Sequence, residues 1–498
     1  GWLSLSTDTL GSASTAIGRA ALANQRTSSA ANKFNTAVGY NAGLEVTTGT
    51  NNTLVGGEAG DALTTGTSNN AVGYLALSAT TTANQNNAFG RSSLASNTTG
   101  ADNSGFGQNT LGSATTASNN TAVGSDAGGA VTTGINNTLI GALAGDALTD
   151  GQENVAVGYQ ALTADTQGEN SVAIGNNALF SQNGVNGNVF NVAIGKNAGF
   201  AITTGVENTL IGGLAGDSLT DADFNVAIGK NALAADTLGS KSTAIGLGAL
   251  QSQNFTSATD SLNVAIGHLA GEKVTTGVRN TLIGALAGDA ITTGSENTAL
   301  GRNAGGGLTT GGTNTFVGAD TGTTITTGGK NTIIGRYNGN SGGLDIRTQS
   351  NNVVLADGDG NIILSYQSSG NTTQMQYVYS NTTSTAANVA ILSSGTISRS
   401  TSSRRYKNTI TDATHGLTKL LALRPVTFKG NNDGDTVFGG LIAEEVHDAG
   451  LTEFVQYNDD NEPDALAYGN MVSLCIKAVQ ELSTSLDAAL ARITTLEG

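Results

Sequence analysis

A five-residue motif, Asn-x-x-(Val/Ile)-Gly, recurs along this chain with a spacing of 17 residues and constrains the fold more than any other feature. Its 19 copies begin at Ser14, Asn35, Asn52, Asn69, Asn86, Asn103, Asn120, Asn137, Asn154, Ser171, Asn191, Asn208, Asn225, Ser242, Asn263, Asn280, Asn297, Asn314 and Asn331. Every copy has an apolar residue in fourth place and glycine in fifth place. A chain that repeats one short unit over most of its length is building an elongated structure rather than enclosing one active-site cavity.

The unit Asn35–Asn51 shows what each copy contributes. It opens with alternating small or polar and apolar residues, which is the period of a short half-buried strand. Gly39 then allows the chain to turn a corner, and Thr47, Thr48 and Gly49 close the unit with turn chemistry. Seventeen residues are too few for a strand–helix–strand crossover, so each unit predicts one coil of a β-solenoid. At about 4.8 Å per coil, the 19 copies predict a rod of roughly 90 Å.

Stacked coils place Asn over Asn and Val or Ile over Val or Ile. We therefore expect a hydrogen-bonded ladder of Asn side chains and a continuous inner ridge of apolar side chains. The chain contains 70 Gly but only 2 Pro, at Pro425 and Pro463, and the absence of proline before them suits an unbroken strand ladder. Each coil has little interior of its own, because most apolar residues are Ala, Val, Leu and Ile. We expect the ridge to be buried against other copies of the chain, in a homo-oligomer.

The repeat lengthens to 20 or 21 residues in three units, which are also the three that begin with serine. The extra residues fall in Asn24–Phe34, Ser181–Phe190 and Ser252–Leu262. Insertions into repeats map to surface loops, so one interpretation is a receptor or glycan contact. The other is a bulge that resets the twist of the solenoid. Nothing in these polar stretches has a chemical signature, which favours the bulge.

Composition changes near residue 342, and the segment 342–401 predicts a β-hairpin followed by an extended stretch. Two strand-like runs flank Asp357-Gly358-Asp359-Gly360, which is a strong hairpin signal. Asp357, Asp359 and Asn361 match half of a calcium loop, but Ser368 stands where the later Glu of that loop belongs. A turn is therefore favoured over a metal site.

The last 97 residues, 402–498, are richer in charge and end in a predicted helix. Apolar residues alternate steps of three and four along it, at Val472, Cys475, Val479, Leu482, Leu486, Ala489, Ile493 and Leu496. That spacing is a heptad seam, and its length favours an intermolecular coiled coil over packing within one domain. The lone Cys475 lies on the seam, so we expect a buried thiol and no disulfide within the chain.

Four ordered runs in this last segment resemble the peptidase S74 domain, the C-terminal intramolecular chaperone of phage tail spikes and fibres. They are SSRRYKNTI at 402–410, LLALRPVTF at 420–428, GLIAEEV at 440–446 and AYGNMVSLCIKAVQEL at 467–482. The preceding run NNVVLADGDGNI resembles the segment that often comes before this domain in tail fibres. The 17-residue coils are similar to the head repeats of YadA-type trimeric adhesins. Both families are trimers, so the resemblance implies a trimer here.

The S74 family cleaves itself with a Ser–Lys dyad in the pattern Ser-Asp-x-Arg-x-Lys. Three residues fall on the Ser, Arg and Lys of this pattern: Ser402, Arg405 and Lys407. The resemblance implies that Ser402, activated by neutral Lys407, attacks the carbonyl of Thr401 and breaks the bond between Thr401 and Ser402, with Arg405 in support. Ser403 replaces the Asp of the pattern, and Glu444 replaces the Gln of the family's Ile-Ala-Gln-Glu run. Spacing alone would favour a basic, serine-rich surface turn, and the family resemblance reverses that preference.

Charge and composition argue against several other classes of function. A net charge of −16 disfavours binding to nucleic acid or to anionic surfaces, and no apolar run approaches the length of a membrane span. We expect no cofactor and no metal, since the histidines are far apart: His268, His415 and His447. A glycan-degrading spike would need paired carboxylates, whereas four aspartates recur in one Ala-Gly-Asp context that looks architectural: Asp61, Asp146, Asp217 and Asp289.

These observations predict a mainly β protein with a trimeric β-solenoid shaft over 1–341, a hairpin and extended tip over 342–401, and an α+β chaperone domain over 402–498 that ends in a coiled coil. The predicted function is a phage tail fibre or spike, extracellular on the virion, that attaches to a host surface receptor of glycan or protein. A segment before Gly1 would join it to other tail proteins. The alternative is a bacterial surface adhesin with a non-cleaving trimerisation domain, which would predict a membrane-anchoring barrel or stalk where this chain has its S74-like helix.

Overall fold

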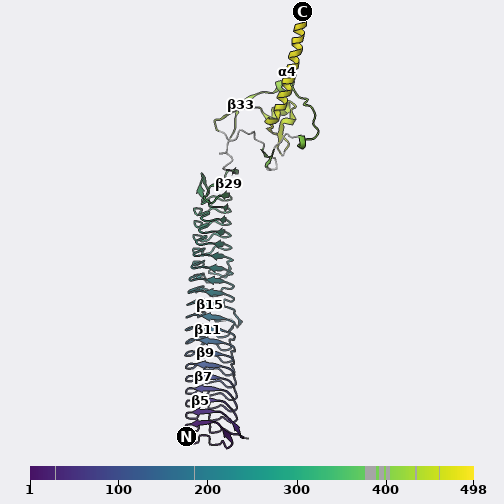
Figure 1. The fold of residues 1–498 in the computed structure, drawn as a ribbon. Coiled ribbons are helices and arrows are strands. Elements are labelled where there is room, and N and C mark those ends of the chain that lie inside the picture. The colour runs from purple at the N-terminus through teal and green to yellow at the C-terminus, as the bar shows by residue number, and fades with distance from the viewer. Residues whose placement is uncertain are drawn as a thin grey trace. The chain divides into compact units, whose positions relative to one another are not determined.

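The computed structural model describes residues 1–27, 30–183, 186–375, 389–391, 397–399, 404–431, 434–458 and 460–498. The chain divides into two compact units, Gly1–Asn381 and Thr382–Gly498. The first is a β-solenoid, and the second is a smaller β/α unit with a long C-terminal helix (Figure 1). The prediction of a solenoid of 17-residue coils followed by a smaller mixed unit is confirmed.

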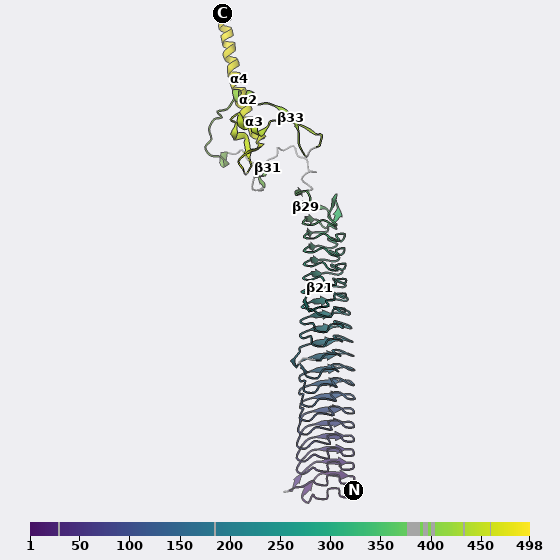
Figure 2. The ribbon, with the colours of Figure 1, turned by 180° about the vertical axis from the view of Figure 1, so that it is seen from behind.

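One strand per coil builds the main sheet of the solenoid, and the strands stack one above another along it (Figures 1 and 2). Neighbouring strands are parallel and in register, so that Ala37 pairs with Leu54 and Leu54 with Ala71. The strands are β2 (Thr15–Ile17), β4 (Thr36–Val38), β5 (Thr53–Val55), β6 (Asn70–Val72), β7 (Asn87–Phe89), β8 (Ser104–Phe106), β9 (Thr121–Val123), β10 (Thr138–Ile140), β11 (Val155–Val157), β13 (Val172–Ile174), β15 (Val192–Ile194), β16 (Thr209–Ile211), β17 (Val226–Ile228), β19 (Thr243–Ile245), β21 (Val264–Ile266), β22 (Thr281–Ile283), β23 (Thr298–Leu300), β24 (Thr315–Val317), β25 (Thr332–Ile334) and β28 (Val353–Ala356). Each of the repeat strands lies between the Asn and the Gly of its motif.

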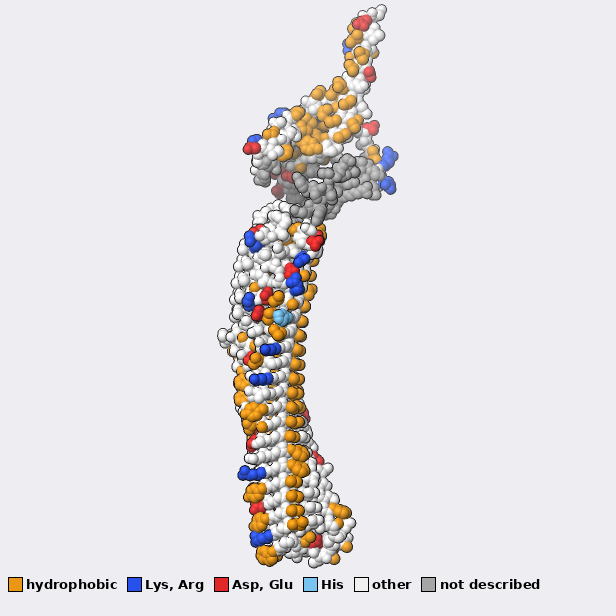
Figure 3. Space-filling model, turned by 60° about the vertical axis from the view of Figure 1, so that its left-hand side comes forward, with side chains coloured by type: hydrophobic (Ala, Val, Ile, Leu, Met, Phe, Trp, Pro, Cys, Tyr) orange, Lys and Arg blue, Asp and Glu red, His pale blue; other side chains and the backbone are white. Residues whose placement is uncertain are grey.

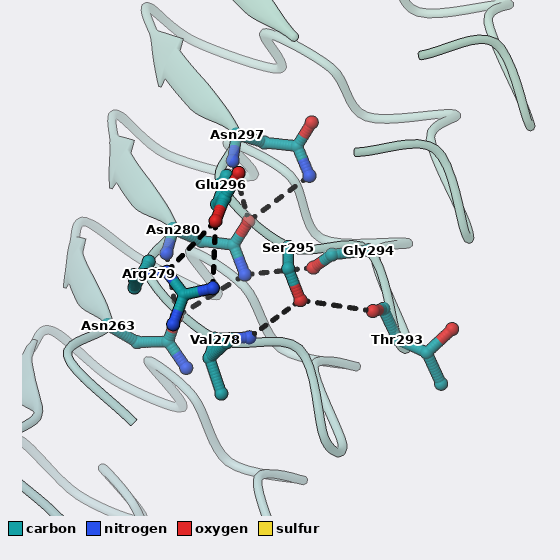
Figure 4. A network of polar contacts seen from close by, with 9 residues as sticks. All are labelled: Asn263, Val278, Arg279, Asn280, Thr293, Gly294, Ser295, Glu296 and Asn297. Atoms are coloured by element: carbon teal, nitrogen blue, oxygen red, sulfur yellow. Dashed lines mark hydrogen bonds and ion pairs between the residues drawn. The ribbon is translucent and has the colours of Figure 1, made fainter. Parts of the chain in front are cut away.

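The Asn ladder that the repeat predicts is present and buried. The carboxamide oxygen of Asn35 accepts hydrogen bonds from the backbone N–H of Asn52 (2.9 Å) and from Asn52 Nδ2 (3.1 Å), and Asn52 Nδ2 also donates to the carbonyl of Gly66 (3.0 Å). Figure 4 shows the same pattern at Asn263, Asn280 and Asn297, with 2.8 Å between Asn280 N and Asn263 Oδ1. Each buried amide therefore fixes the start of one coil to the coil next to it.

The apolar side chain in fourth place does not face the interior, so the prediction of an inner ridge of Val and Ile is wrong. Side chains alternate across a strand, and the buried Asn in first place puts the third residue inside and the fourth outside. Ala37 and Leu54, in third place, are fully buried. Ile17 and Ile140, in fourth place, are 58% and 39% exposed. The ridge is a surface feature of the single chain.

We number the positions of each coil from 1 at the motif Asn or Ser. Positions 9 and 12 share the interior volume in every coil from Ser14 to Lys330. Where position 9 is Gly, position 12 is Val, Leu or Ile, as in Gly43 and Val46. A Cβ on Gly43, whose φ is +61°, would lie 2.7 Å from a methyl of Leu54 in the adjacent coil. Where position 9 is Leu, position 12 is small or polar, as in Leu111 and Ala114. Core volume is therefore matched within and between coils.

The three long coils share a buried polar cluster centred on a glutamine at position 12. Gln182 Nε2 donates to Asp165 (2.6 Å) and Ser171 (3.0 Å), and Gln182 Oε1 accepts from Asn191 Nδ2 (3.0 Å). Gln253 makes the same three contacts with Asp236, Ser242 and Asn263, and Gln25 bonds Asp8, Ser14 and Asn35. In these units glutamine rather than the residue at position 1 continues the Asn ladder, which explains why only the long units begin with serine.

A short parallel strand pair accompanies each cluster. The pairs are β1 (Gly11–Ser12) with β3 (Ala31–Asn32), β12 (Gly168–Glu169) with β14 (Gly187–Asn188), and β18 (Gly239–Ser240) with β20 (Thr259–Asp260). The inserted residues thus extend the solenoid wall by a second ladder. These contacts support the interpretation of the insertions as structural bulges.

Gln182→Leu is expected to destabilise the coils around it by roughly 3 kcal/mol, because it leaves Asp165, Ser171 and Asn191 buried with fewer hydrogen-bond partners. Hydrogen–deuterium exchange of the flanking amides, alongside urea unfolding, measures the change. The neighbouring Asn183→Leu is the matched control, since the Asn183 side chain is exposed. Equal effects of the two substitutions would contradict the role of the buried cluster.

The solenoid ends in a predicted hairpin, which the structure confirms. β28 pairs in parallel with β25 and antiparallel with β29 (Ile362–Gln367), and β29 pairs with β30 (Thr372–Met375). β26 (Asn340–Ser341) and β27 (Leu344–Asp345) form a smaller hairpin beside it. Asp357 Oδ1 accepts from the backbone N–H groups of Asp359 (3.0 Å) and Asn361 (2.9 Å). The carboxylate of Asp357 therefore stabilises the turn.

The second unit builds a small core from short elements. They are β31 (Val389–Ile391), β32 (Ile397–Arg399), η1 (Arg404–Tyr406), α2 (Leu417–Ala422), β33 (Val426–Lys429), β34 (Val437–Gly440), α3 (Ala443–Asp448), η2 (Thr452–Phe454), β35 (Val455–Tyr457), β36 (Pro463–Leu466) and α4 (Tyr468–Glu497). Its buried apolar cluster consists of Val446, Leu451, Phe454, Val455, Met471 and Leu474. Only the first part of α4 contributes to this core, through residues such as Met471 and Leu474. In the part of the chain that the structure describes, no helix is both long and apolar enough to span a bilayer.

Candidate functional site

The predicted self-cleavage site lies at the start of the second unit. Thr401 and Ser402 fall outside the described residues, so the dyad remains a prediction. The residues that follow form the 3-10 turn η1, and the backbone N–H of Lys407 donates to the carbonyl of Arg404 (3.2 Å). Arg405 and Lys407 are exposed. The predicted base thus sits on a surface turn directly after the predicted nucleophile in sequence.

The chain downstream of this turn is tied to the rest of the unit by polar contacts. His415 Nδ1 lies 2.6 Å from Glu453 Oε1, and the backbone N–H of Leu417 donates to Glu481 on α4 (2.7 Å). Lys419 Nζ donates to the carbonyl of Ala449 at the end of α3 (2.6 Å). Residues 415–419 are therefore anchored to three different elements, and the turn with Lys407 precedes a fixed segment.

An ion pair links the chain before β33 to α3. Arg424 donates from Nε to Glu445 Oε2 (3.1 Å) and from Nη2 to Glu445 Oε1. The hydrogen bonds from Arg424 lower the pKa of Glu445, and the same carboxylate raises the pKa of Arg424. Glu444, the departure from the family's Gln, is exposed at the start of α3. That departure therefore lies on the surface and leaves the apolar core unaltered.

The histidines of this unit have structural partners. His447 Nδ1 lies 2.9 Å from the hydroxyl of Tyr457, and His415 pairs with Glu453. His268 lies on the surface of the solenoid. Within the described ranges, no three His, Cys, Asp or Glu side chains gather as a metal-binding group.

Residues 402–456 match the family model Peptidase_S74, described as the chaperone of endosialidase. The segment is a peptidase S74 chaperone domain. The match begins at Ser402, the residue that the sequence assigns as nucleophile. A β-solenoid followed by an S74 chaperone domain is typical of phage tail fibre and spike proteins. No curated protein and no solved structure matches the chain.

Helix α4 of the second unit continues past the buried core of that unit and there carries an exposed apolar face. Val479, Leu482, Leu486 and Ile493 of the predicted seam are 63%, 54%, 58% and 50% exposed in the single chain. Cys475 is also exposed, so the prediction of a buried thiol is wrong for the single chain. An apolar face this long on a free helix marks a surface for association.

The solenoid carries a second uncovered apolar surface, which we call the position-4 ridge. It consists of the fourth residue of each motif, and Figure 3 shows apolar side chains running as a continuous column along the shaft. Its exposed members include Ile17, Phe89, Phe106, Val123, Ile140, Ile266, Leu300 and Ile334. Phe89 and Phe106 stack with ring centroids 5.1 Å apart. A ridge of this length on a monomer is far larger than the scattered apolar residues of ordinary surfaces.

The recurring aspartates lie in different coils and do not form a catalytic pair. One carboxylate oxygen each of Asp61, Asp217 and Asp289 is buried without a hydrogen-bond partner among the described residues, and burial raises the pKa of all three. Asp146, the fourth, accepts a hydrogen bond from Thr163 in the next coil. Successive members are at least four coils apart, or about 19 Å at the usual strand spacing, which is too far for two carboxylates to flank one glycosidic bond. This supports the architectural interpretation.

Proposed function

We propose that this chain is the shaft and assembly part of a homotrimeric phage tail fibre or spike that attaches the virion to a host surface. Its S74 domain brings three chains together and is then released by self-cleavage before Ser402. The observation that carries the proposal is the S74 match at the end of a solenoid with an uncovered apolar ridge along its length. Host receptors of glycan or protein, and other tail proteins, complete the proposed set of partners.

The geometry of the sheet suits burial of the ridge around a threefold axis. A side of about five extended residues is about 17 Å long, and three such sides placed as a triangle lie about 5 Å from its centre. That distance is close to the reach of Val and Ile side chains. Position 4 of three chains would thus fill the axis of the trimer.

The chaperone has a physical task in this arrangement. The coils are nearly alike, so chains can pair one coil out of step at little cost in free energy. A clamp at the C-terminus, formed by S74 units and the apolar face of α4, would hold three chains level while the solenoids associate. Once the ridge is buried, the clamp is no longer needed for stability, and cleavage can release it.

A surface adhesin with a non-cleaving trimerisation domain is the second candidate. One observation favours it, the replacement of the family's Asp by Ser403 in the cleavage pattern. The S74 domain itself favours the phage fibre, since this domain follows solenoids in tail proteins. The two candidates share the trimer and differ in cleavage.

The mass of the intact assembly tests the shared part. We expect Ser402→Ala protein, which keeps the chain whole, to have a mass of three times 49.7 kDa, about 149 kDa, by light scattering. Adding Ile266→Glu and Leu300→Glu to the ridge is expected to prevent this association by placing six carboxylates at the axis. The matched control is Thr310→Glu, on an exposed turn away from the ridge. The proposal would be refuted if Ser402→Ala protein with an unaltered ridge were a monomer, or if Thr310→Glu lost assembly as much as the ridge variants do.

A further inference from the structure

Two columns of side chains flank the main sheet of the solenoid, and their residue types alternate along its second half. Position 6, just after the Gly corner, alternates basic and uncharged residues: Lys196, Gly213, Lys230, Leu247, His268, Ala285 and Arg302. Position 17, just before the next motif, alternates apolar and charged residues: Phe190, Glu207, Phe224, Lys241, Leu262, Arg279 and Glu296. Phe190, Phe224 and Leu262 are about half exposed, at 50%, 46% and 47%.

The two alternations are matched strand by strand. Position 17 of one coil and position 6 of the next lie at the two ends of the same strand, as Phe224 and Lys230 do at the ends of β17. We call the two residues at the ends of one strand a level. At three levels a basic residue at position 6 stands with an apolar residue at position 17. At three others an uncharged residue at position 6 stands with a long charged residue at position 17, as in Ala285 with Arg279. At the last level both are charged and opposite, Arg302 with Glu296.

The two residues of a level do not contact each other within one chain. Phe224 and Lys230 lie beyond opposite ends of β17 (Val226–Ile228), and the strand between them holds their Cα atoms on the order of 15 Å apart. Three of the four charged residues of the position-17 column are paired locally instead, Arg279 with Glu296 at 2.7 Å and Lys241 with Asp260. Figure 4 shows the Arg279–Glu296 pair beside the Asn ladder. Lys196 and Lys230 form no ion pair within the described part of the chain and are exposed.

We propose that the position-6 column of one chain packs on the position-17 column of the next chain around the trimer, level by level. The inference rests on the proposed trimer and adds the surface and register of its contacts. When three sheets form the sides of a triangle, each corner joins the end of one strand to the start of the corresponding strand in the next chain. Such contacts run head to tail and close into a ring.

The chemistry at each level is favourable in this register. The ammonium groups of Lys196 and Lys230 lie over the rings of Phe190 and Phe224 of the next chain, as cation–π contacts. Gly213 and Ala285 leave room for the long side chains of Glu207 and Arg279. A slip of one coil removes both cation–π contacts. It places Lys230 against Lys241 in one direction and Arg302 against Arg279 in the other, and each of these like-charge pairs is accompanied by one opposite-charge pair of Glu207 with Lys196 or Lys230. The cation–π contacts, and not charge repulsion, therefore favour the level register over a one-coil slip, and the C-terminal clamp still holds the three chains in register.

Disulfide trapping tests the seam. In a Ser402→Ala, Cys475→Ser background, Phe224→Cys with Lys230→Cys is expected to give a covalent three-chain species on a non-reducing denaturing gel after mild oxidation. A bridge needs Cα atoms within about 7 Å, so the two cysteines cannot pair within one chain. The pair Arg279→Cys with Ala285→Cys tests another level without removing an aromatic ring and is expected to behave alike.

The matched control is Lys230→Cys with Leu262→Cys, two strands out of level and expected to stay uncrosslinked. A three-chain species from the control instead would overturn the register. Trimers by light scattering that give no covalent three-chain species in either test pair would overturn the seam while leaving the proposed trimer intact. Covalent dimers alone would indicate face-to-face pairing and overturn the seam as well. A monomer by light scattering would remove the proposed trimer and the seam together.

Discussion

Ser402→Ala is expected to abolish self-cleavage. Wild-type protein is expected to yield two pieces separated between Thr401 and Ser402, and the variant a single chain of 49.7 kDa by intact mass spectrometry. The reason is that the Ser402 hydroxyl is the proposed nucleophile, and alanine has no hydroxyl to form the bond. Removing a nucleophile from a self-activating pair lowers the rate by roughly ten-thousand-fold or more.

Lys407 is the second half of the test. Lys407→Ala is expected to stop cleavage as well, and Lys407→Arg is expected to do the same, because a guanidinium stays protonated and cannot accept the serine proton. This pair separates the role of a base from the role of a positive charge. Lys429→Ala is the matched control, since Lys429 is an exposed lysine on β33 that pairs with Asp435. Cleavage that persists in Ser402→Ala would refute the nucleophile. Full-length wild-type protein would favour the adhesin with a non-cleaving domain.

The coil and its Asn ladder follow from the sequence because a strict repeat leaves few arrangements. A motif that returns every 17 residues must place like residues over like, and a buried amide such as Asn52 finds its hydrogen-bond partners in the side-chain amide and the backbone of the adjacent coils. The parallel in-register pairing of the strands follows from the same repetition. These features depend on local sequence alone and not on long-range packing.

The direction of the ridge was predicted wrongly because apolar residues are assigned to the interior by default. Val and Ile in fourth place are the most apolar residues of the motif, but it is the Asn in first place whose side chain is buried in the interior. The carboxamide of Asn52, for example, donates to Asn35 and to the carbonyl of Gly66 and accepts from the backbone N–H and the Nδ2 of Asn69, and these four bonds replace bonds to water. Strand alternation then forces position 4 outward. The signal was available in the sequence, as the small Ala that usually occupies position 3.

The serine units and the cleavage site show two further limits. The sequence revealed that Ser171 begins a long unit, but the partner Gln182 lies 11 residues away, and only the fold brings them within 3.0 Å. At the cleavage site, Ser402 and Lys407 are an ordinary spacing in a serine-rich stretch, so the family resemblance alone singles them out. A role that depends on one hydroxyl leaves no periodic trace, whereas a structural role repeated in every coil does.

Gly212→Ala is expected to destabilise its coil by about 3 kcal/mol or more. Gly212 has φ +135°, a region that is almost confined to glycine, and a Cβ there would lie 2.6 Å from the backbone of Gly229 in the next coil. The glycine in fifth place forms such a column along the shaft, so each coil can approach the next only while this position has no side chain. Because a solenoid is stabilised by neighbouring coils, the loss is expected to spread only a few coils from the substitution.

Gly213→Ala is the matched control, one residue further along. Gly213 has an ordinary φ, its nearest neighbour would be 4.0 Å from an added Cβ, and Ala285 already occupies the equivalent position of another coil. We expect a change within about 0.5 kcal/mol. Hydrogen–deuterium exchange of the amides in residues 191–246 resolves the two variants. Similar protection in both would mean that the solenoid tolerates wider spacing between coils.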